Sequence, residues 1–344
     1  MARYDRSAED HLAWIAQVVE EPLEPELPIC DPHHHLWLDQ GHTGWPYTLA
    51  DLHADTEAEV NGISHNIVRT VFLECHAQYR TDGPEHLRPV GETEFVIELA
   101  EESPASGQAE IAAIVGHADL ALGDVVEEVL AAHDEAGRGR FRGIRYGTAQ
   151  DDHPPLSRPD ALTMDDPTYL AGVRTVGAMG FTYDAMVYHP QLPELAEVAR
   201  SCPDTPMVVN HLGLFLGTGP YKDKREESFV FWRQAMSELA TCPNTFLKVG
   251  GIGMPMMGIR WDKRDTPATS EELDDAWGDH IRFVIDEFGP ERCMFESNFP
   301  VDKRGAGYIV LWNAFKRIAA EYSPNEKRDL FHNTAARAYR LEQV

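Results

Sequence analysis

Short hydrophobic segments alternate with amphipathic segments along most of this chain of 344 residues. Eight of the hydrophobic segments have the length and flanking residues of buried strands: Leu27–His35, Val68–His76, Ile111–Gly116, Phe141–Gly147, Phe181–His189, Met207–Leu212, Thr245–Gly250 and Cys293–Phe299. The segments between them repeat apolar residues with the period of a helix, as in Leu120–His133 and Glu272–Phe288. Because strands that alternate with helices pair in parallel through right-handed crossovers, eight such units predict an α/β fold, a distorted (β/α)8 TIM barrel.

An open, doubly wound sheet is the alternative that the same alternation allows. That fold usually carries a glycine-rich, phosphate-binding turn after its first strand, and no such turn follows Leu27–His35. Residues 1–26 form a separate N-terminal segment, with an amphipathic helix over Ala8–Glu20 and a proline-containing linker. The predicted division is therefore an N-terminal helix and linker at 1–26 and a barrel at 27–344.

Segments rich in glycine, proline and aspartate follow several of the predicted strands, and they predict enlarged loops: Gly41–Ala50, Gln150–Asp166, Gly213–Glu227 and Ile252–Thr269. Loops that follow the strands of a barrel form its C-terminal face, where barrel enzymes carry their active sites. Polar residues at the ends of the strands are therefore the candidates for chemistry.

Acidic residues outnumber basic ones by 57 to 30, for a formal charge of −27. This balance argues against nucleic acid as a partner, because a phosphate backbone would be repelled over most of the surface. The chain contains no run of about 20 apolar residues, so no membrane span is predicted. The five scattered cysteines form no CxxC pair, which indicates free thiols in a reducing compartment. We expect a cytoplasmic enzyme with a small-molecule substrate, and the possibility of a homo-oligomer stays open.

The first predicted strand ends in Asp31-Pro32-His33-His34-His35. Side chains two residues apart in a strand share a face, so His33 and His35 should point together into the barrel mouth while His34 points away. Two convergent imidazoles are half of a metal site, although a histidine-rich strand end that only hydrogen-bonds its neighbours is the plainer alternative. Later strands also end in histidine, in Tyr188-His189-Pro190 and Asn210-His211-Leu212-Gly213. Four imidazoles at one end of a barrel favour a functional site.

These segments, with Asp31–Trp37 and Ser297-Asn298-Phe299-Pro300, resemble the amidohydrolase superfamily. The resemblance is to its amidohydrolase-related branch, which includes the 2-pyrone-4,6-dicarboxylate lactonase and sugar-lactonase group and, more distantly, non-oxidative decarboxylases. It implies a TIM barrel, hydrolysis of a lactone or amide-like bond, and one divalent metal ion, Zn²⁺ by preference, that is weakly held or absent. It also implies His33, His35 and His189 as metal ligands and His211 as a polarising or acid–base residue.

One position departs from the family's pattern. The family usually ends its eighth strand with an aspartate that serves as ligand and general base, and here that residue is Asn298. An asparagine can bind a metal weakly or orient a water, but it cannot accept a proton. Asp302, in the loop above the site, is the replacement base that we favour, and Glu296 and Glu74 are the alternatives. A salt bridge within its own loop would instead give Asp302 a structural role.

Many binuclear amidohydrolases bridge two metals with a carboxylated lysine on the fourth strand. The first lysine of this chain is Lys222, so a lysine-bridged pair of metals is excluded. A single ion, or no firmly held ion, remains.

Arg145 ends the fourth predicted strand and should point into the barrel. A guanidinium there suits bidentate capture of a substrate carboxylate, and an ion pair with Glu74 is the structural alternative. Lys248 is an isolated cation in the seventh strand, where substrate contact and structural pairing are equally open. Besides Arg145 and Glu74, we expect substrate contacts from Tyr188 and from Met254, which lies in a glycine- and methionine-rich loop.

Together these residues predict a metal-assisted hydrolase of a lactone or cyclic amide-like bond in a small, carboxylate-bearing substrate. Two alternatives stay open. A non-oxidative decarboxylase of an aromatic or unsaturated acid could use the same scaffold, and its release of carbon dioxide would distinguish it from a hydrolase. A degenerate barrel that binds a ligand without turnover would follow from the loss of the usual base at Asn298.

Overall fold

The computed structural model describes residues 6–105, 108–153, 156–157 and 162–341. Its barrel strands are β1 (Pro28–His34), β4 (Asn66–Leu73), β5 (Glu110–His117), β6 (Phe141–Gly147), β7 (Thr182–Met186), β8 (Met207–Val209), β9 (Thr245–Val249) and β10 (Cys293–Phe295). They form one eight-stranded sheet in chain order, and neighbouring strands pair in parallel. Each strand overlaps its predicted segment, so the predicted strands are confirmed.

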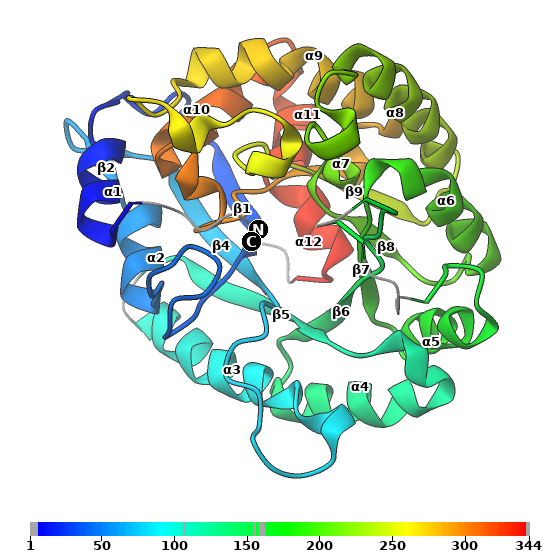
Figure 1. The fold of residues 1–344 in the computed structure, drawn as a ribbon. Helices are drawn as coiled ribbons and strands as arrows, with labels where there is room; N and C mark the ends of the chain where they lie inside the picture. Colours follow the sequence, from blue (N-terminus) through cyan, green and yellow to red (C-terminus); the bar gives the residue numbers. More distant parts are fainter. Residues whose placement is uncertain (1–5, 106–107, 154–155, 158–161, 342–344) are drawn as a thin grey trace.

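The sheet closes into a barrel through the chain that follows β10. The amide of Asn298 donates to the carbonyl of His33 at 2.9 Å, and the amide of His35 donates to the carbonyl of Phe299 at 2.8 Å. The predicted (β/α)8 TIM barrel is therefore confirmed, with a ring of strands surrounded by helices (Figure 1). Closure places the end of β1, with its histidines, directly beside the end of β10.

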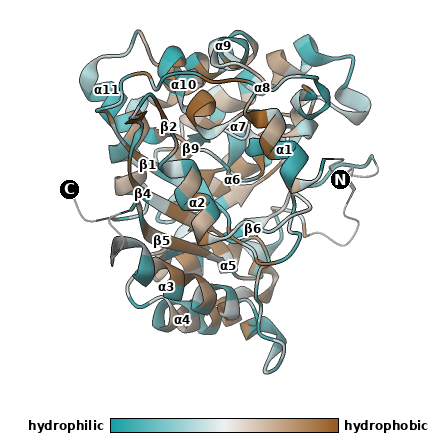
Figure 2. Cartoon of the chain, turned by 90° about the vertical axis from the view of Figure 1, so that its left-hand side faces the viewer, coloured by the Kyte–Doolittle hydropathy of each residue, from teal (hydrophilic) through white to brown (hydrophobic). Residues whose placement is uncertain are grey.

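Helices cover the outside of the barrel: α2 (Leu49–Thr56), α3 (Val90–Ala105), α4 (Val126–Ala136), α5 (Pro167–Ala178), α6 (Leu192–Ser201), α8 (Arg225–Ala240), α9 (Ser270–Phe288) and α10 (Tyr308–Ile318). In α9 the buried residues include Leu273, Trp277, Ile281 and Phe288, which recur at helical spacing on one face. Figure 2 shows the resulting layers, with hydrophobic strands such as β5 inside a shell of helices of mixed polarity.

The C-terminal segment is not a single continuous helix. It forms α11 (Pro324–Arg328), a π-helical turn (Asp329–Asn333) and α12 (Thr334–Ala338). The residues after this turn, among them Ala335 and Tyr339, pack with Cys30, Val71, Val208 and Met294 of the strands. Viewed along the barrel, α12 therefore lies within the ring of strands (Figure 1).

Other departures from the sequence pattern lie near the N-terminus. The first helix, α1 (Ala8–Ile15), is shorter than predicted, and a two-stranded hairpin, β2 (Glu59–Val60) with β3 (Ile63–Ser64), follows α2. Parts of the predicted loop Gln150–Asp166 lie outside the described residues. No helix among those described is long and apolar enough to cross a membrane. All five cysteines are buried and free, as expected.

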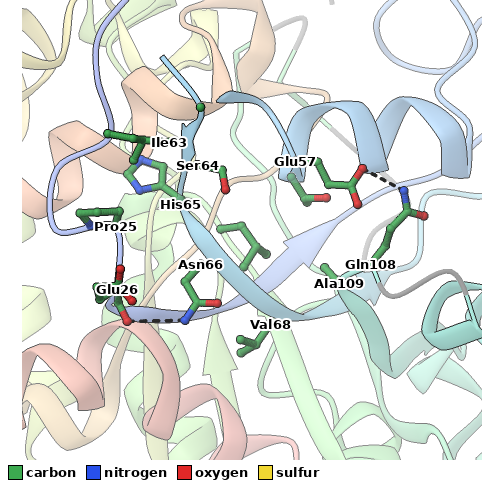
Figure 3. A pocket seen from close by; sticks show the side chains of 13 residues that line it. Pro25, Glu26, Glu57, Ile63, Ser64, His65, Asn66, Val68, Gln108 and Ala109 are labelled. Atoms are coloured by element: carbon green, nitrogen blue, oxygen red, sulfur yellow. Dashed lines mark hydrogen bonds between the residues drawn. The ribbon is translucent and has the colours of Figure 1, made fainter. Parts of the chain in front are cut away.

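A cavity of about 770 Å³ opens beside this hairpin, and Figure 3 shows its polar lining, which includes Glu26, Glu57, His65 and Gln108. It lies where β4 and β5 begin. The predicted site histidines instead follow the ends of the strands, so this cavity is not part of the candidate active site.

Candidate active site

His33 and His35 point to the same side of the chain, as the alternation in a strand predicts, and their Nε2 atoms lie 3.3 Å apart. The Nδ1–H of His35 donates to the carbonyl of Leu73 at 2.8 Å, which leaves a lone pair on Nε2. Both imidazoles are buried, and burial lowers their pKa well below the ordinary value of histidine. Neutral rings of this kind can bind a cation. His34 turns instead toward Phe72, on the outer side of the sheet.

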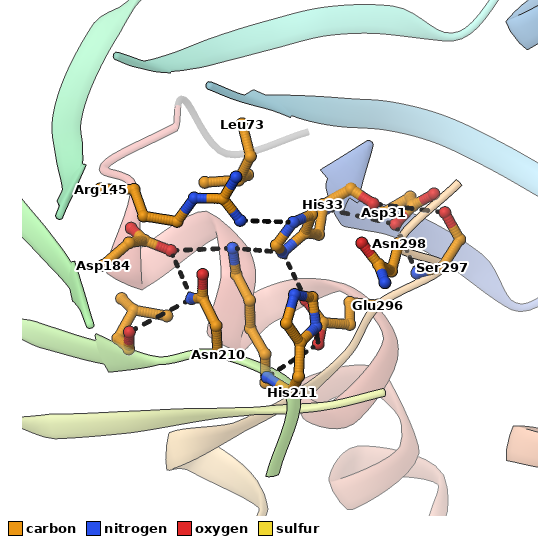
Figure 4. A network of polar contacts seen from close by, with 12 residues as sticks. Asp31, His33, Leu73, Arg145, Asp184, Asn210, His211, Glu296, Ser297 and Asn298 are labelled. Atoms are coloured by element: carbon orange, nitrogen blue, oxygen red, sulfur yellow. Dashed lines mark hydrogen bonds and ion pairs between the residues drawn. The ribbon is translucent and has the colours of Figure 1, made fainter. Parts of the chain in front are cut away.

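Glu296, directly after β10, lies between two imidazoles (Figure 4). Its Oε1 accepts hydrogen bonds from Nδ1 of His211 at 2.7 Å and from the backbone amide of His211 at 3.2 Å. Its Oε2 lies 2.7 Å from Nδ1 of His33, but within the described residues it accepts no well-directed hydrogen bond. Because Nδ1 of His211 donates to the carboxylate, Nε2 of His211 is left as an acceptor.

A buried ion pair lies against His33. The ammonium of Lys248 is 2.9 Å from Oδ1 of Asp184 and 3.3 Å from Nδ1 of His33. Asp184 also accepts hydrogen bonds from Asn210 Nδ2 and from the hydroxyl of Tyr339, each at 2.9 Å. A buried ion pair is tolerated when further hydrogen bonds satisfy its remaining atoms, as they do here. Of the two roles left open for Lys248, the structure therefore shows structural pairing.

Arg145 is paired with Glu74, the alternative that the sequence left open. Its Nε donates to Oε1 of Glu74 at 2.7 Å, one terminal nitrogen donates to the Glu74 carbonyl, and the other lies 3.4 Å from Nε2 of His33. Burial opposes ionisation of Glu74, but Arg145, with the nearby imidazoles, lowers the pKa of Glu74 below its usual value. Glu74 and His33 thus occupy two edges of the guanidinium, which leaves few of its N–H groups for a substrate carboxylate.

Asn298 and Asp302 bind each other. Asn298 donates its side-chain amide to Oδ1 of Asp302 at 2.9 Å, and the amide of Gly253 donates to Oδ2 at 2.9 Å. Burial raises the pKa of Asp302 to about 8, and the charge of Glu296 adds to this effect. Both oxygens of Asp302 are therefore committed to holding the loops after β9 and β10, rather than to a salt bridge within its own loop.

His189 lies outside the group formed by His33, His35 and His211. Its ring stacks on Phe215 at a centroid distance of 5.1 Å, and its Nδ1 accepts the backbone amide of Leu216 at 3.1 Å. A neutral imidazole that accepts at Nδ1 carries its proton on Nε2, so in this tautomer it has no second lone pair for a metal. The structure thus gives a physical reason against His189 as a ligand.

Tyr188 and Met254, expected to contact substrate, are both buried in the main hydrophobic cluster. Their role as substrate contacts stays a prediction.

The residues present suit a divalent cation. Within the described part of the chain, ligand atoms of His33, His211 and Glu296 lie within 4.8 Å of one another. The distance of 3.3 Å between Nε2 of His33 and Nε2 of His35 also suits a shared ion, since two Zn–N bonds of about 2.1 Å at a tetrahedral angle separate the nitrogens by about 3.4 Å. Oε2 of Glu296, 2.7 Å from Nδ1 of His33, is a further buried acceptor. A neutral His33 offers a single lone pair, so only one of these two groups can hold an ion through it, which favours one ion.

The comparisons with known proteins identify the family of this chain. A family model described as amidohydrolase matches residues 30–341. The chain belongs to the amidohydrolase family. An uncharacterized protein of Sinorhizobium fredii is 30% identical to it over 338 residues, which cover 92% of this chain and 99% of the relative. An L-fucono-1,5-lactonase of Burkholderia multivorans is 29% identical over 254 residues, 73% of this chain and 77% of that protein.

A crystal structure supports the same membership. An amidohydrolase from Burkholderia multivorans with bound zinc matches with a TM-score of 0.68 at 25% identity, over 91% of this chain and 99% of that one. The barrel with histidines at its strand ends is therefore an amidohydrolase scaffold.

Sequence reasoning about this amidohydrolase overlooked two residues of the site. Asp184 lies inside a predicted strand at an odd spacing from His189, so strand alternation did not link the two residues, and Tyr339 sits in a C-terminal helical pattern that gives no sign of entering the barrel. Glu296 was considered only as a base, although its strand position beside Asn298 already indicated that it faces inward. The structure shows that it orients histidines.

Proposed function

We propose that this amidohydrolase hydrolyses the lactone of a small sugar acid, with His211 as general base. The observation that carries the proposal is the pair formed by His211 and Glu296, in which the carboxylate holds Nδ1–H at 2.7 Å and leaves Nε2 free. A carboxylate that orients an imidazole in this way also stabilises the imidazolium that forms when the ring takes a proton. The lactonase activity named for the relative from Burkholderia multivorans supports the choice of reaction.

The chemistry follows from these groups. Nε2 of His211 accepts a proton from water as the water oxygen adds to the lactone carbonyl. The ring C–O bond then breaks, and the imidazolium returns the proton to the departing alkoxide, so the product is a hydroxy acid. The positive charge of Arg145, whose terminal nitrogen lies 3.4 Å from Nε2 of His33, favours the negative charge that develops on the carbonyl oxygen. Asn298, which cannot accept a proton, is then no obstacle to catalysis.

A divalent metal ion, Zn²⁺ by preference, is the proposed cofactor. His33 and His35 would hold it through Nε2, with Glu296 behind Nδ1 of His33 in the arrangement that commonly orients a metal-binding histidine. When bound, the ion supplies Lewis-acid polarisation of the carbonyl. The guanidinium of Arg145, 3.4 Å from Nε2 of His33, opposes the charge of the ion and favours weak binding.

The test is a lactone-opening assay that follows acid release with a pH indicator. Wild-type protein should open L-fucono-1,5-lactone, and His211→Asn should lower kcat by about 10²- to 10⁴-fold, the usual contribution of a general base. Release of carbon dioxide from an aromatic acid, with no lactone opened, would establish the decarboxylase instead. Ligand binding without either activity would establish the degenerate barrel.

A further inference from the structure

The carboxylate of Glu74 has one oxygen that accepts no hydrogen bond within the part of the chain that the structure describes. Oε1 accepts the Nε–H of Arg145 at 2.7 Å. Oε2 is buried and accepts no hydrogen bond from the described residues, and the side chain is 6% exposed. A buried charged acceptor without a donor is costly, and natural structures usually retain one only where a partner arrives from outside the chain.

Polar rings lie near this oxygen. His76 Nε2 lies 3.7 Å from Oε2, and His76 Nδ1 is 2.9 Å from the hydroxyl of Tyr79. The ring of His117 is 5.4 Å from that of His76 and stacks against Tyr146 at 6.0 Å. These groups offer hydrogen bonds together with flat, apolar ring faces, the combination that suits a small hydroxylated ring.

His76 lies beside Oε2, and most of its side chain is exposed to solvent. Its side chain is 61% exposed, and its backbone occupies the left-handed region at φ 64°. Rotation between staggered side-chain conformers is cheap for an exposed residue. Glu74 itself is held in place, because Arg145 binds both its side chain and its carbonyl.

We propose that Glu74, His76 and His117 form a subsite that recognises a ring hydroxyl of the lactone substrate. The proposal rests on the proposed lactonase function and deepens it. A hydroxyl donates its hydrogen to Oε2 of Glu74 and can accept one from His76, whereas a substrate carboxylate has no hydrogen to donate and is repelled by Glu74. The substrate recognised here is therefore a neutral hydroxylated lactone rather than the carboxylate-bearing molecule expected from the sequence.

The test compares substrates that differ by one hydroxyl. We would measure kcat/KM for L-fucono-1,5-lactone, for each of its analogues that lack a single ring hydroxyl, and for δ-valerolactone, which has none. For the wild-type protein, kcat/KM for one of the deoxy analogues should be about 10- to 100-fold lower than for L-fucono-1,5-lactone, as expected when a hydrogen bond to a charged group is lost. In Glu74→Gln that ratio should fall below about fivefold, because a neutral hydrogen bond discriminates less.

The ratio of the two kcat/KM values is the readout, because a general loss of activity lowers both values and leaves their ratio unchanged. Glu94→Gln is the matched control, because Glu94 pairs with Arg80 on the exposed surface. The ratio of kcat/KM values in this variant should equal that of the wild type. If Glu74→Gln does not fold, His76→Ala tests the same subsite from its exposed side, with a ratio at least threefold lower than in wild type. An unchanged ratio in either folded variant overturns the subsite and leaves the lactonase function standing.

Binding separates the two proposals. Calorimetry gives Kd for the unreactive 1,5-lactam analogue and for its deoxy counterpart, and the ratio of these two values reports the same preference for the hydroxyl. Preference for the hydroxylated lactam that depends on Glu74, in protein that opens no lactone, would retain the subsite and refute the proposed function. Faster turnover of 2-pyrone-4,6-dicarboxylate than of any hydroxylated lactone would overturn the subsite.

Discussion

Glu296→Gln should disable the enzyme while leaving it folded. In the wild-type protein, Oε1 of Glu296 accepts hydrogen bonds from the backbone amide and from Nδ1 of His211, and Oε2 faces Nδ1 of His33. Glutamine replaces one of these acceptors with an NH₂ donor. If the NH₂ faces His211, it meets two donors, and His211 must move its proton to Nε2. If it faces His33, that ring must instead present a lone pair at Nδ1 and protonate Nε2.

Either orientation removes one imidazole lone pair from the site. We therefore expect kcat to fall by about 10²- to 10⁴-fold, which corresponds to about 2.7–5.5 kcal/mol of transition-state stabilisation. KM should change by less than about threefold, because the bulk and hydrogen-bonding atoms of the side chain are kept. Steady-state lactone opening measures both constants, and circular dichroism verifies the fold.

Glu110→Gln provides the matched control. This variant also loses a carboxylate, one that pairs with Arg140, but Glu110 lies at the start of β5, at the opposite end of the strand from the site. Its kcat should stay within about twofold of wild type, since surface substitutions away from special features have small effects. A folded Glu296→Gln protein with kcat within about threefold of wild type would refute the assignment of His211 and Glu296 as the proton-transfer pair.

Three further predictions concern charge, metal and the C-terminal segment. Burial raises the pKa of Asp302 from its ordinary 3.8 to about 8, so the stabilisation by the protonated carboxyl is complete below about pH 4 and is lost as pH rises through 8. In urea unfolding, the free energy of unfolding of Asp302→Asn relative to wild type should accordingly rise by about 1.4 kcal/mol for each pH unit between about 4 and 8. A difference that stays constant with pH would contradict the buried proton. After dialysis, elemental analysis should find at most about one zinc per chain, with zinc lost in His35→Ala and retained in His189→Ala; the reverse result would restore His189 as a ligand. Tyr339→Phe should lower the free energy of unfolding by about 1.5–3 kcal/mol, because Asp184 loses a donor; an unchanged denaturation midpoint would show that the hydroxyl contributes nothing.

The sequence by itself determined the barrel and the place of the active site. Strand and helix periodicity is a local property, so eight alternating units were visible without coordinates, and the closed sheet of eight strands confirms them. The alternation of side chains in a strand is equally local. It placed His33 and His35 on one side, and their Nε2 atoms are 3.3 Å apart.

Tertiary structure alone decided which of the strand-end residues work together. Whether Arg145 meets a substrate or Glu74 depends on the stagger of β4 against β6, which no local pattern encodes. His189 lies three residues beyond the end of β7, in a short 3-10 helix rather than in the predicted strand, and the loop after β8 supplies the amide of Leu216 that occupies its Nδ1. Tyr339 reaches Asp184 only because the C-terminal turn packs among the strands. Hydrogen bonds between residues distant in sequence depend on how the barrel closes, and closure is a property of the whole chain.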